Sequence, residues 1–375
     1  MNLHFSAVFT VSLLTGIAII LYRFYFLNLQ SISRIGVSVF LFNLMALLLR
    51  LLFPMEFAFT VTIPVEHGMP TLTRFLAIPV AKWGGTDITI LSVLTAVWAV
   101  VSSALFVQMI VSYQRYRKGL VALSRTLDVH ELTEGKLNED EATALSKVLV
   151  VQSCHVQSPL ILGQIKPIIV LPMLQLTPDE WVYVIRHEIN HYRYGDLWIK
   201  LFVKITLIVY WWNPVIHILA RLITELLEIR NDKRIIASMP AEEKIAYYEC
   251  LLKIAKSRTR KRRDRLALAF DSAKKNVAMR RIRLIDSEEK KFSRTKHRVI
   301  NVTIALVAVI TVLSFFVVFE SSSMPGTHAA GNYELSQDNS YIILSGEQYD
   351  IYLDDAYMAT VSVIPDSLFG GSALT

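Results

Sequence analysis

The sequence predicts a membrane α-helical protein with an α+β cytoplasmic domain and a small, β-rich extracellular tail. Three observations support this fold class. Four apolar stretches approach the ~20 residues that a helix needs to cross a bilayer. Cationic side chains are concentrated before the last of these stretches and are absent after residue 320. The central part of the chain mixes short strand patterns with capped helix patterns, as a folded domain does.

The apolar stretches divide the chain into membrane and aqueous parts. The chain has 375 residues, of which 53% are hydrophobic and 19% charged, whereas a typical soluble domain is about 25% charged. The two cysteines, Cys154 and Cys250, do not form a Cys-x-x-Cys pair and imply no disulfide framework. The expected transmembrane helices cover residues 5–22, 35–53, 88–111 and 299–319.

Cationic residues orient these helices, because cytoplasmic loops carry an excess of lysine and arginine. Arg23 and Arg34 follow the first stretch, which we interpret as an uncleaved anchor with its N-terminus outside. The loop 54–87 is then outside. The cytoplasmic domain occupies 114–256, the basic linker 257–298 follows on the same side, and the tail 320–375 is outside.

Arg50 is the one charge inside an expected transmembrane helix. We expect it to extend toward the membrane interface, with a role in signalling as the alternative.

The motif RHEINHYRYGD, residues 186–196, lies on an expected helix. Thr177 is placed as the N-cap, with Pro178 at the first helical position and Glu180 completing a capping box. His187 and His191 are four residues apart and therefore share one helix face. This H-E-x-x-H pattern predicts a zinc site with both histidines as ligands and Glu188 as the general base.

A third metal ligand is expected from residues 222–236, LITELLEIRNDKRII. Glu228 and Asp232 form an E-x-x-x-D pair, in which the glutamate binds the metal and the aspartate fixes the tautomer of a ligand histidine. Glu225 lies on the same stripe and is the alternative ligand. Because His187 and Glu228 must meet at one ion, residues 197–220 do not form a fifth crossing. We expect two helices there, broken at Asn213-Pro214.

Before the metal motif, residues 138–149 predict a short amphipathic helix. Residues 151–172 predict two short strands around a turn, interrupted at Pro159, Gly163 and Pro167.

Four segments together resemble a known family: SPLILGQIKPIIVLP, the helix with HEINH, WWNP and ELLEIRND. They are similar to the bacterial antirepressor metalloproteases, integral-membrane signal transducers that include the β-lactam sensors of the Bla and Mec type. The resemblance covers roughly residues 1–320. It implies a gluzincin-type zinc domain and activation by an outside signal. It also implies self-cleavage in the cytoplasmic linker and loss of a cytoplasmic transcriptional repressor.

Two features depart from the family pattern. Asn231 stands where the family usually has a cysteine, at a position that is not a metal ligand. The β-lactam sensors carry a large outside domain with a Ser-x-x-Lys nucleophile, and residues 320–375 contain no lysine. We therefore expect an input other than β-lactam acylation. This segment alternates enough to predict two or three short strands, and its ligand or partner stays open.

The basic linker is expected to lie against anionic membrane lipid, since residues 253–298 hold 18 Lys/Arg and 5 Asp/Glu. Without interleaved aromatic residues it is not expected to bind nucleic acid. Its apolar stretch 266–270, with Ala269 and Phe270, is the hypothetical self-cleavage segment. We expect it to lie extended along an edge strand formed near Pro159, Gly163 and Pro167.

The leading interpretation is thus a signal-transducing zinc endopeptidase of the bacterial cell membrane. Its expected partners are a repressor, lipid, an extracellular ligand and, as a candidate, a second copy of the chain. A quality-control membrane protease is one alternative. A non-catalytic membrane receptor on a protease scaffold is another, disfavoured by the intact Glu188.

Overall fold

The computed structural model describes residues 5–26, 37–65, 67–84, 86–237, 239–260, 294–321, 340–345, 348–353 and 356–361. The chain divides into two compact units. One comprises Met1–Thr60 with Ala96–Val317, and the other comprises Val61–Thr95 with Val318–Thr375. The first unit contains a helical bundle and an α+β domain.

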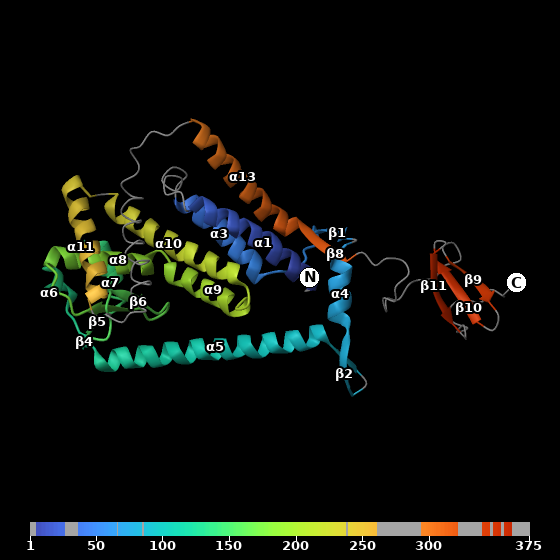
Figure 1. Ribbon diagram of the computed structural model, residues 1–375. Helices are drawn as coiled ribbons and strands as arrows, with labels where there is room; N and C mark the ends of the chain where they lie inside the picture. The colour runs from blue at the N-terminus through green and yellow to red at the C-terminus, as the bar shows by residue number, and fades with distance from the viewer. Residues whose placement is uncertain are drawn as a thin grey trace. The chain divides into compact units, whose positions relative to one another are not determined.

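The helical bundle is built around apolar helices that are distant in sequence. Figure 1 shows α1 (Phe5–Phe26), α3 (Val37–Leu52) and α10 (Pro214–Ile236) side by side, and α13 (Arg294–Phe316) contacts α1 and α3. Their shared core is apolar, which stabilises the bundle by removing hydrocarbon surface from water. It includes Ile19, Leu44, Leu47, Ile223, Leu226 and Leu227.

Two helices are long and apolar enough to cross a membrane, over Phe5–Phe24 and Ile90–Ala122. The other two expected transmembrane helices are shorter apolar helices in the described residues, over Val37–Leu52 and Ala305–Phe316. The expected helix 299–319 is wrong at its end, since Val317–Ser321 forms strand β8. Paired β-branched valines favour a strand at that point.

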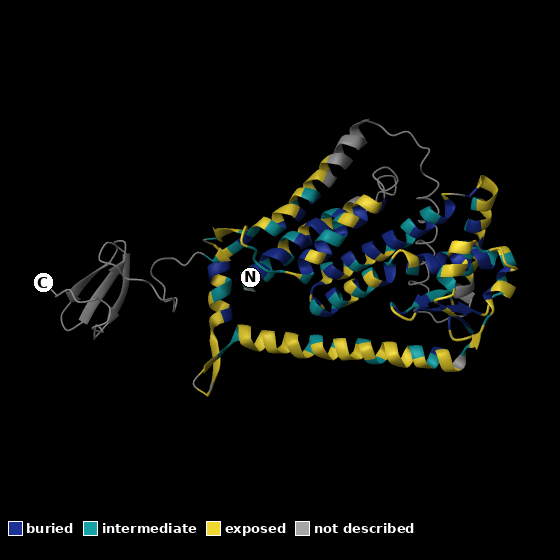
Figure 2. Cartoon of the chain, turned by 180° about the vertical axis from the view of Figure 1, so that it is seen from behind, coloured by how far each residue is buried: buried dark blue, intermediate teal, exposed yellow. Residues whose placement is uncertain are grey.

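The helix α5 (Ile90–Leu123) is exposed along nearly its whole length, as Figure 2 shows in yellow. No residue of its most apolar window is buried. Two polar side chains join it to helix α9 (Asp196–Val209). Trp98 Nε1 donates to Val209 O at 2.7 Å and Ser102 Oγ to Ile208 O at 3.2 Å. These bonds satisfy carbonyls at the C-terminal end of α9, which lack partners within their own helix.

Residues 197–220 form two helices, as the sequence predicts. Helix α9 ends at Val209, and α10 begins at Pro214 with Asn213 as its N-cap. Both helices pack on the bundle core, and Tyr210 between them donates its hydroxyl hydrogen to Leu51 O at 2.8 Å. The two helices form a hairpin, which keeps residues before α9 near residues late in α10.

Arg50 does not extend to an interface, which corrects the sequence expectation. Its side chain is fully buried, and its Nε donates to Ser314 O at 2.6 Å. A second nitrogen donates to Phe53 O at 2.8 Å and to Met55 O at 3.0 Å. Carbonyls at the ends of α3 and α13 hold the cation, because helix C-termini carry partial negative charge.

The α+β domain has a four-stranded sheet in the order β4-β5-β7-β6. The strands are β4 (Arg125–Thr126), β5 (Leu149–Ser153), β6 (Leu160–Leu162) and β7 (Ile168–Pro172). Strands β5 and β7 are parallel, and the other pairs are antiparallel. Strands β6 and β7, joined by the turn that begins at Gly163, are the two strands expected within 151–172. Strand β5, which begins at Leu149, is a further strand that the sequence analysis did not predict.

Helix α8 (Pro178–Arg193) packs against strand β6. Three further helices contact α8: α6 (Val129–Thr133), α7 (Glu139–Leu145) and α11 (Ala241–Arg260). Helix α7 begins after Asn138 as expected and ends at Leu145, earlier than the expected 149. The chain there turns into β5. The core between sheet and helices is apolar and includes Ile169, Leu171, Trp181, Ile185 and Ile189.

The second unit holds short elements within the expected outside loop 54–87 and the tail. Strand β1 (Val61–Val65) pairs with β8, and β2 (Pro79–Trp83) pairs with β3 (Thr86–Thr89). Helix α4 covers Met69–Ala77. The tail forms an antiparallel sheet of β9 (Ser340–Ser345), β10 (Gln348–Leu353) and β11 (Ala356–Val361), which confirms the strands expected there.

Candidate metal centre

Helices α8 and α10 bring three metal-ligating side chains together. One ligand atom from each of His187, His191 and Glu228 lies within 4.8 Å of the others. The histidines are four residues apart on α8, so both imidazoles project from one face. The helix begins as the sequence predicts, with a reciprocal capping box between Thr177 and Glu180.

The Glu228 carboxylate lies between the two rings. His187 Nε2 is 3.3 Å from Glu228 Oε2, and His191 Nε2 is 3.4 Å from Glu228 Oε1. The three donors thus converge with the Nε2 atom of each histidine directed at the same point. Glu188 follows the first histidine and is buried, in the position where the sequence places the general base.

The outer nitrogen of His187 is held by two groups. Tyr247 Oη on α11 is 3.2 Å from His187 Nδ1, and Asp232 Oδ1 is 3.3 Å from the same atom. The tyrosine hydroxyl also donates to Asp232 Oδ1 at 2.7 Å. Such partners fix the ring orientation and leave Nε2 for a metal. The structure places Asp232 where the sequence predicts it.

The outer nitrogen of His191 has a partner that the sequence analysis missed. Asp196 Oδ2 is 2.7 Å from His191 Nδ1, and Arg230 donates to the other carboxylate oxygen. Asp196 is the first residue of α9, directly after Gly195 in the left-handed conformation with φ +72°. That turn returns the chain toward the end of α8.

Asn231 supports the site through the backbone, as its Nδ2 donates to His187 O at 2.8 Å. This contact uses the position where the resembled family usually has a cysteine. It ties α10 to α8 at the level of the first histidine.

Burial and hydrogen bonding set the charges of the cluster. Burial by itself lowers the pKa of His187, but bonds to Asp232 and Glu228 outweigh it and raise that pKa to about 9. Burial by itself raises the pKa of Glu228, yet His187 and His191 hold it well below its ordinary value. The Glu228 carboxylate is therefore anionic, and its negative charge favours a cation at the cluster.

The other predicted residues lie along β6 and its ends. Pro159 precedes β6, Gly163 follows it with φ +90°, and Pro167 precedes β7. A Cβ on Gly163 would lie 2.7 Å from Lys166 O, so the tight turn requires glycine there. Strand β6 is at one edge of the sheet and packs against α8. Ala269 and Phe270 lie outside the described residues.

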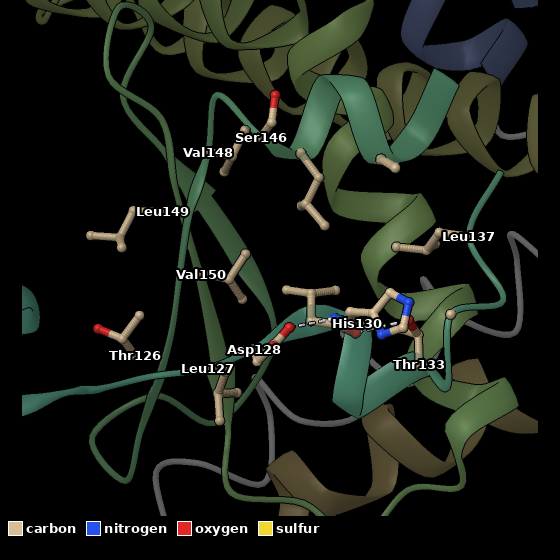
Figure 3. Close-up of a pocket in the computed structure, with 14 residues that line it drawn as sticks. Thr126, Leu127, Asp128, His130, Thr133, Leu137, Ser146, Val148, Leu149 and Val150 are labelled. Carbon is tan, nitrogen blue, oxygen red and sulfur yellow. Dashed lines mark hydrogen bonds between the residues drawn. The ribbon is translucent and has the colours of Figure 1, made fainter. Parts of the chain in front are cut away.

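A separate cavity of about 380 Å³ lies between β4, β5, α6 and α7 (Figure 3). Its lining is mainly apolar, and Asp128 in it accepts a hydrogen bond from the His130 backbone at 2.8 Å. None of the three clustered ligands lines this cavity. It is distinct from the metal centre.

The donor set fits zinc. Two imidazole nitrogens and one carboxylate oxygen form the His₂Glu set of catalytic zinc sites, which leave a further position for water or substrate. Outer-shell carboxylates on both histidines are the usual support of such ligands. The arrangement defines the candidate site of a metallopeptidase.

Comparison with known proteins agrees with this class. The family model described as BlaR1 peptidase M56 matches residues 71–285, more than half of the chain. The chain belongs to this peptidase family. The match contains α8 and α10, and therefore the whole candidate metal centre.

Individual relatives are more distant. The regulatory protein BlaR1 of Bacillus licheniformis is 27% identical over 150 residues, which are 40% of this chain and 25% of that protein. The methicillin resistance mecR1 proteins of Staphylococcus aureus and Staphylococcus epidermidis are 25% identical over 194 residues, 50% of this chain and 32% of theirs. The chain thus matches a quarter to a third of these relatives' length.

Proposed function

We propose that this chain is a zinc endopeptidase of the bacterial membrane that converts an extracellular signal into peptide-bond cleavage in the cytoplasm. The observation that carries the proposal is the convergence of His187, His191 and Glu228, with Glu188 buried beside them on α8. Membership of a peptidase family supports the same chemistry.

The proposed topology has four transmembrane helices, α1, α3, α5 and α13, with the N-terminus and the tail outside. The apolar length of α1 and α5 supports two of these crossings. The hairpin of α9 and α10 packs against α1 and α3. Its two arms return to the same side, so that Asp196 at the start of α9 and Glu228 on α10 both lie at the metal centre. Basic residues before α13 support a cytoplasmic position of the peptidase, because cytoplasmic loops carry an excess of lysine and arginine.

In the proposed mechanism, His187, His191 and Glu228 would hold zinc, while Asp232 and Asp196 orient the two rings. Zinc, when bound, would polarise the scissile carbonyl and acidify the attacking water. Glu188 takes a proton from that water and passes it to the leaving amine.

The substrates and partners follow from the family resemblance. We propose self-cleavage in the linker 257–298, followed by loss of a cytoplasmic transcriptional repressor. The names of the relatives, which refer to regulation and to methicillin resistance, are consistent with signalling. Strand β6 offers an edge on which an extended substrate, such as the segment 266–270, would add as a further strand.

The test compares the wild type with Glu188→Gln, both purified in lipid nanodiscs. Zinc per chain is measured by mass spectrometry of the metal, and fragments are mapped by peptide mass spectrometry. Glu242→Gln, an exposed glutamate on α11, serves as the matched control. We expect about one zinc per chain in all three and linker fragments only from the wild type and the control. A wild type without zinc, or equal fragments from all three, contradicts the proposal.

A further inference from the structure

Lys200 lies on the open side of the metal centre. It follows Asp196 by four residues on α9, so both side chains share one helix face. Its Nζ is 3.3 Å from Glu228 Oε1. The Lys200 side chain is 34% exposed, whereas those of His187 and His191 are 10% and 3% exposed. Among these four side chains, Lys200 and Glu228, at 34% and 23%, are the most accessible from solvent.

The Lys200 ammonium has donors to spare. A lysine carries three N–H donors, and within the described part of the chain its one hydrogen bond goes to Glu228. The nearby cation Arg230 donates to Asp196 and is 16% exposed. Lys200 thus combines contact with a metal ligand, access to solvent and unused donors.

Amide hydrolysis creates a charge that needs such a donor. When the water oxygen bonds to the carbonyl carbon, the water proton moves to Glu188 and the C=O π electrons move to the carbonyl oxygen. The C–N bond then breaks as that oxyanion collapses, and Glu188 returns the proton to the amine nitrogen. A fixed donor at the oxyanion lowers the barrier of the first step.

We propose that Lys200 is a catalytic residue whose ammonium binds the substrate carbonyl oxygen and stabilises the oxyanion. This assignment rests on the proposed peptidase function. A merely structural Lys200 would instead hold the Glu228 carboxylate in position through their 3.3 Å contact, and its removal would release zinc or weaken every zinc-directed ligand alike. The two roles differ in what they do to tetrahedral, oxyanion-like ligands.

The experiment uses the full chain in nanodiscs with Lys200→Met, Lys200→Arg and Lys204→Met. Lys204 is exposed one turn further along α9 and is the matched control. Zinc per chain is measured first. Binding is then measured for two probes, a phosphinic peptide that mimics the tetrahedral oxyanion and a thiol peptide that ligates zinc without mimicking it.

We expect all variants to keep about one zinc. Lys200→Met should weaken the phosphinic peptide about 100-fold, the scale of one lost oxyanion donor, and change the thiol peptide less than about 3-fold. Lys200→Arg should recover most of the loss, and Lys204→Met should match the wild type. Zinc loss in Lys200→Met, or equal weakening of both probes, overturns the assignment. A zinc-loaded wild type that binds neither probe overturns the proposed function, and this assignment with it.

Discussion

Two buried polar clusters in this chain, the candidate metal centre and the surroundings of Arg50, differ in the groups that form their hydrogen bonds. At the candidate metal centre, the polar contacts are between side chains. Each histidine has an aspartate at Nδ1, and both share Glu228 at Nε2. At Arg50, the cation is held by backbone carbonyls and lies 5.6 and 5.3 Å from the ring centres of Phe57 and Phe315. No carboxylate of the described residues pairs with it.

The difference reflects what each cluster has to do. The candidate metal centre, in the proposed function, has to hold a metal cation, and its carboxylates concentrate negative charge around the two histidines. At the Arg50 cluster, carbonyls accept from Nε and Nη1 and aromatic faces lie beside the cation, while Nη2 is buried without a hydrogen-bond partner among the described residues. It also joins positions 264 residues apart in the chain. The candidate metal centre has the residues for catalysis, whereas the Arg50 cluster joins α3 to α13.

The largest expected effect separates these roles. Arg50→Met should lower the free energy of unfolding by about 2–4 kcal/mol, because buried carbonyls lose their donor. Zinc content should stay at about one per chain. Denaturant unfolding in detergent micelles measures the first and metal analysis the second. The exposed Arg221→Met on α10 is the control. Unchanged stability, or loss of zinc with a folded chain, would show that the two clusters are not independent in this way.

Asp196→Asn should come next in size. It removes the carboxylate that fixes the His191 tautomer at 2.7 Å, and losses of outer-shell partners typically weaken metal affinity about 10–100-fold. Competition with a fluorescent zinc chelator measures the change. The exposed Asp179→Asn on α8 should leave affinity unaltered. Wild-type affinity in Asp196→Asn would mean that Asp196 only pairs with Arg230.

Tyr247→Phe should have a smaller effect on the same assay. The phenylalanine keeps the packing of α11 but removes the hydrogen bond to Asp232. We expect about 1 kcal/mol, or roughly 5-fold in zinc affinity. A loss as large as that of Asp196→Asn would show that the hydroxyl, rather than Asp232, orients His187.

Lys253→Met should change the free energy of unfolding very little. Its ion pair with Glu180 is 2.7 Å long, but the lysine side chain is 48% exposed, and such surface pairs contribute below about 1 kcal/mol. A larger loss of stability in the same unfolding assay would show that surface charge holds α11 to α8.

The sequence predicted the metal cluster because its ligands carry local signals. A capped helix places His187 and His191 on one face, and the spacing of Glu228 and Asp232 marks the second helix. Both patterns need only helical periodicity. Asp196 carried a weaker signal, its position five residues after His191 beyond a glycine turn. Tyr247 and Lys200 carried none, because only the packing of α9 and α11 brings them to the site.

The same reasoning explains the errors. The sequence analysis expects Arg50 at an interface because its partner Ser314 O, 264 residues away, reaches it only when α13 packs on α3. Strand β5 was missed because it pairs in parallel with β7 through a crossing connection. Long-range pairing of this kind leaves no periodic signal in the sequence.

The central claim is that His187, His191 and Glu228 bind one zinc ion. It is tested most directly by zinc per chain in the wild type, Glu228→Gln and Glu225→Gln, the last being the rival ligand one turn earlier on α10. We predict about one zinc in the wild type and Glu225→Gln, and a large loss in Glu228→Gln. Zinc retained by Glu228→Gln and lost from Glu225→Gln would contradict the account.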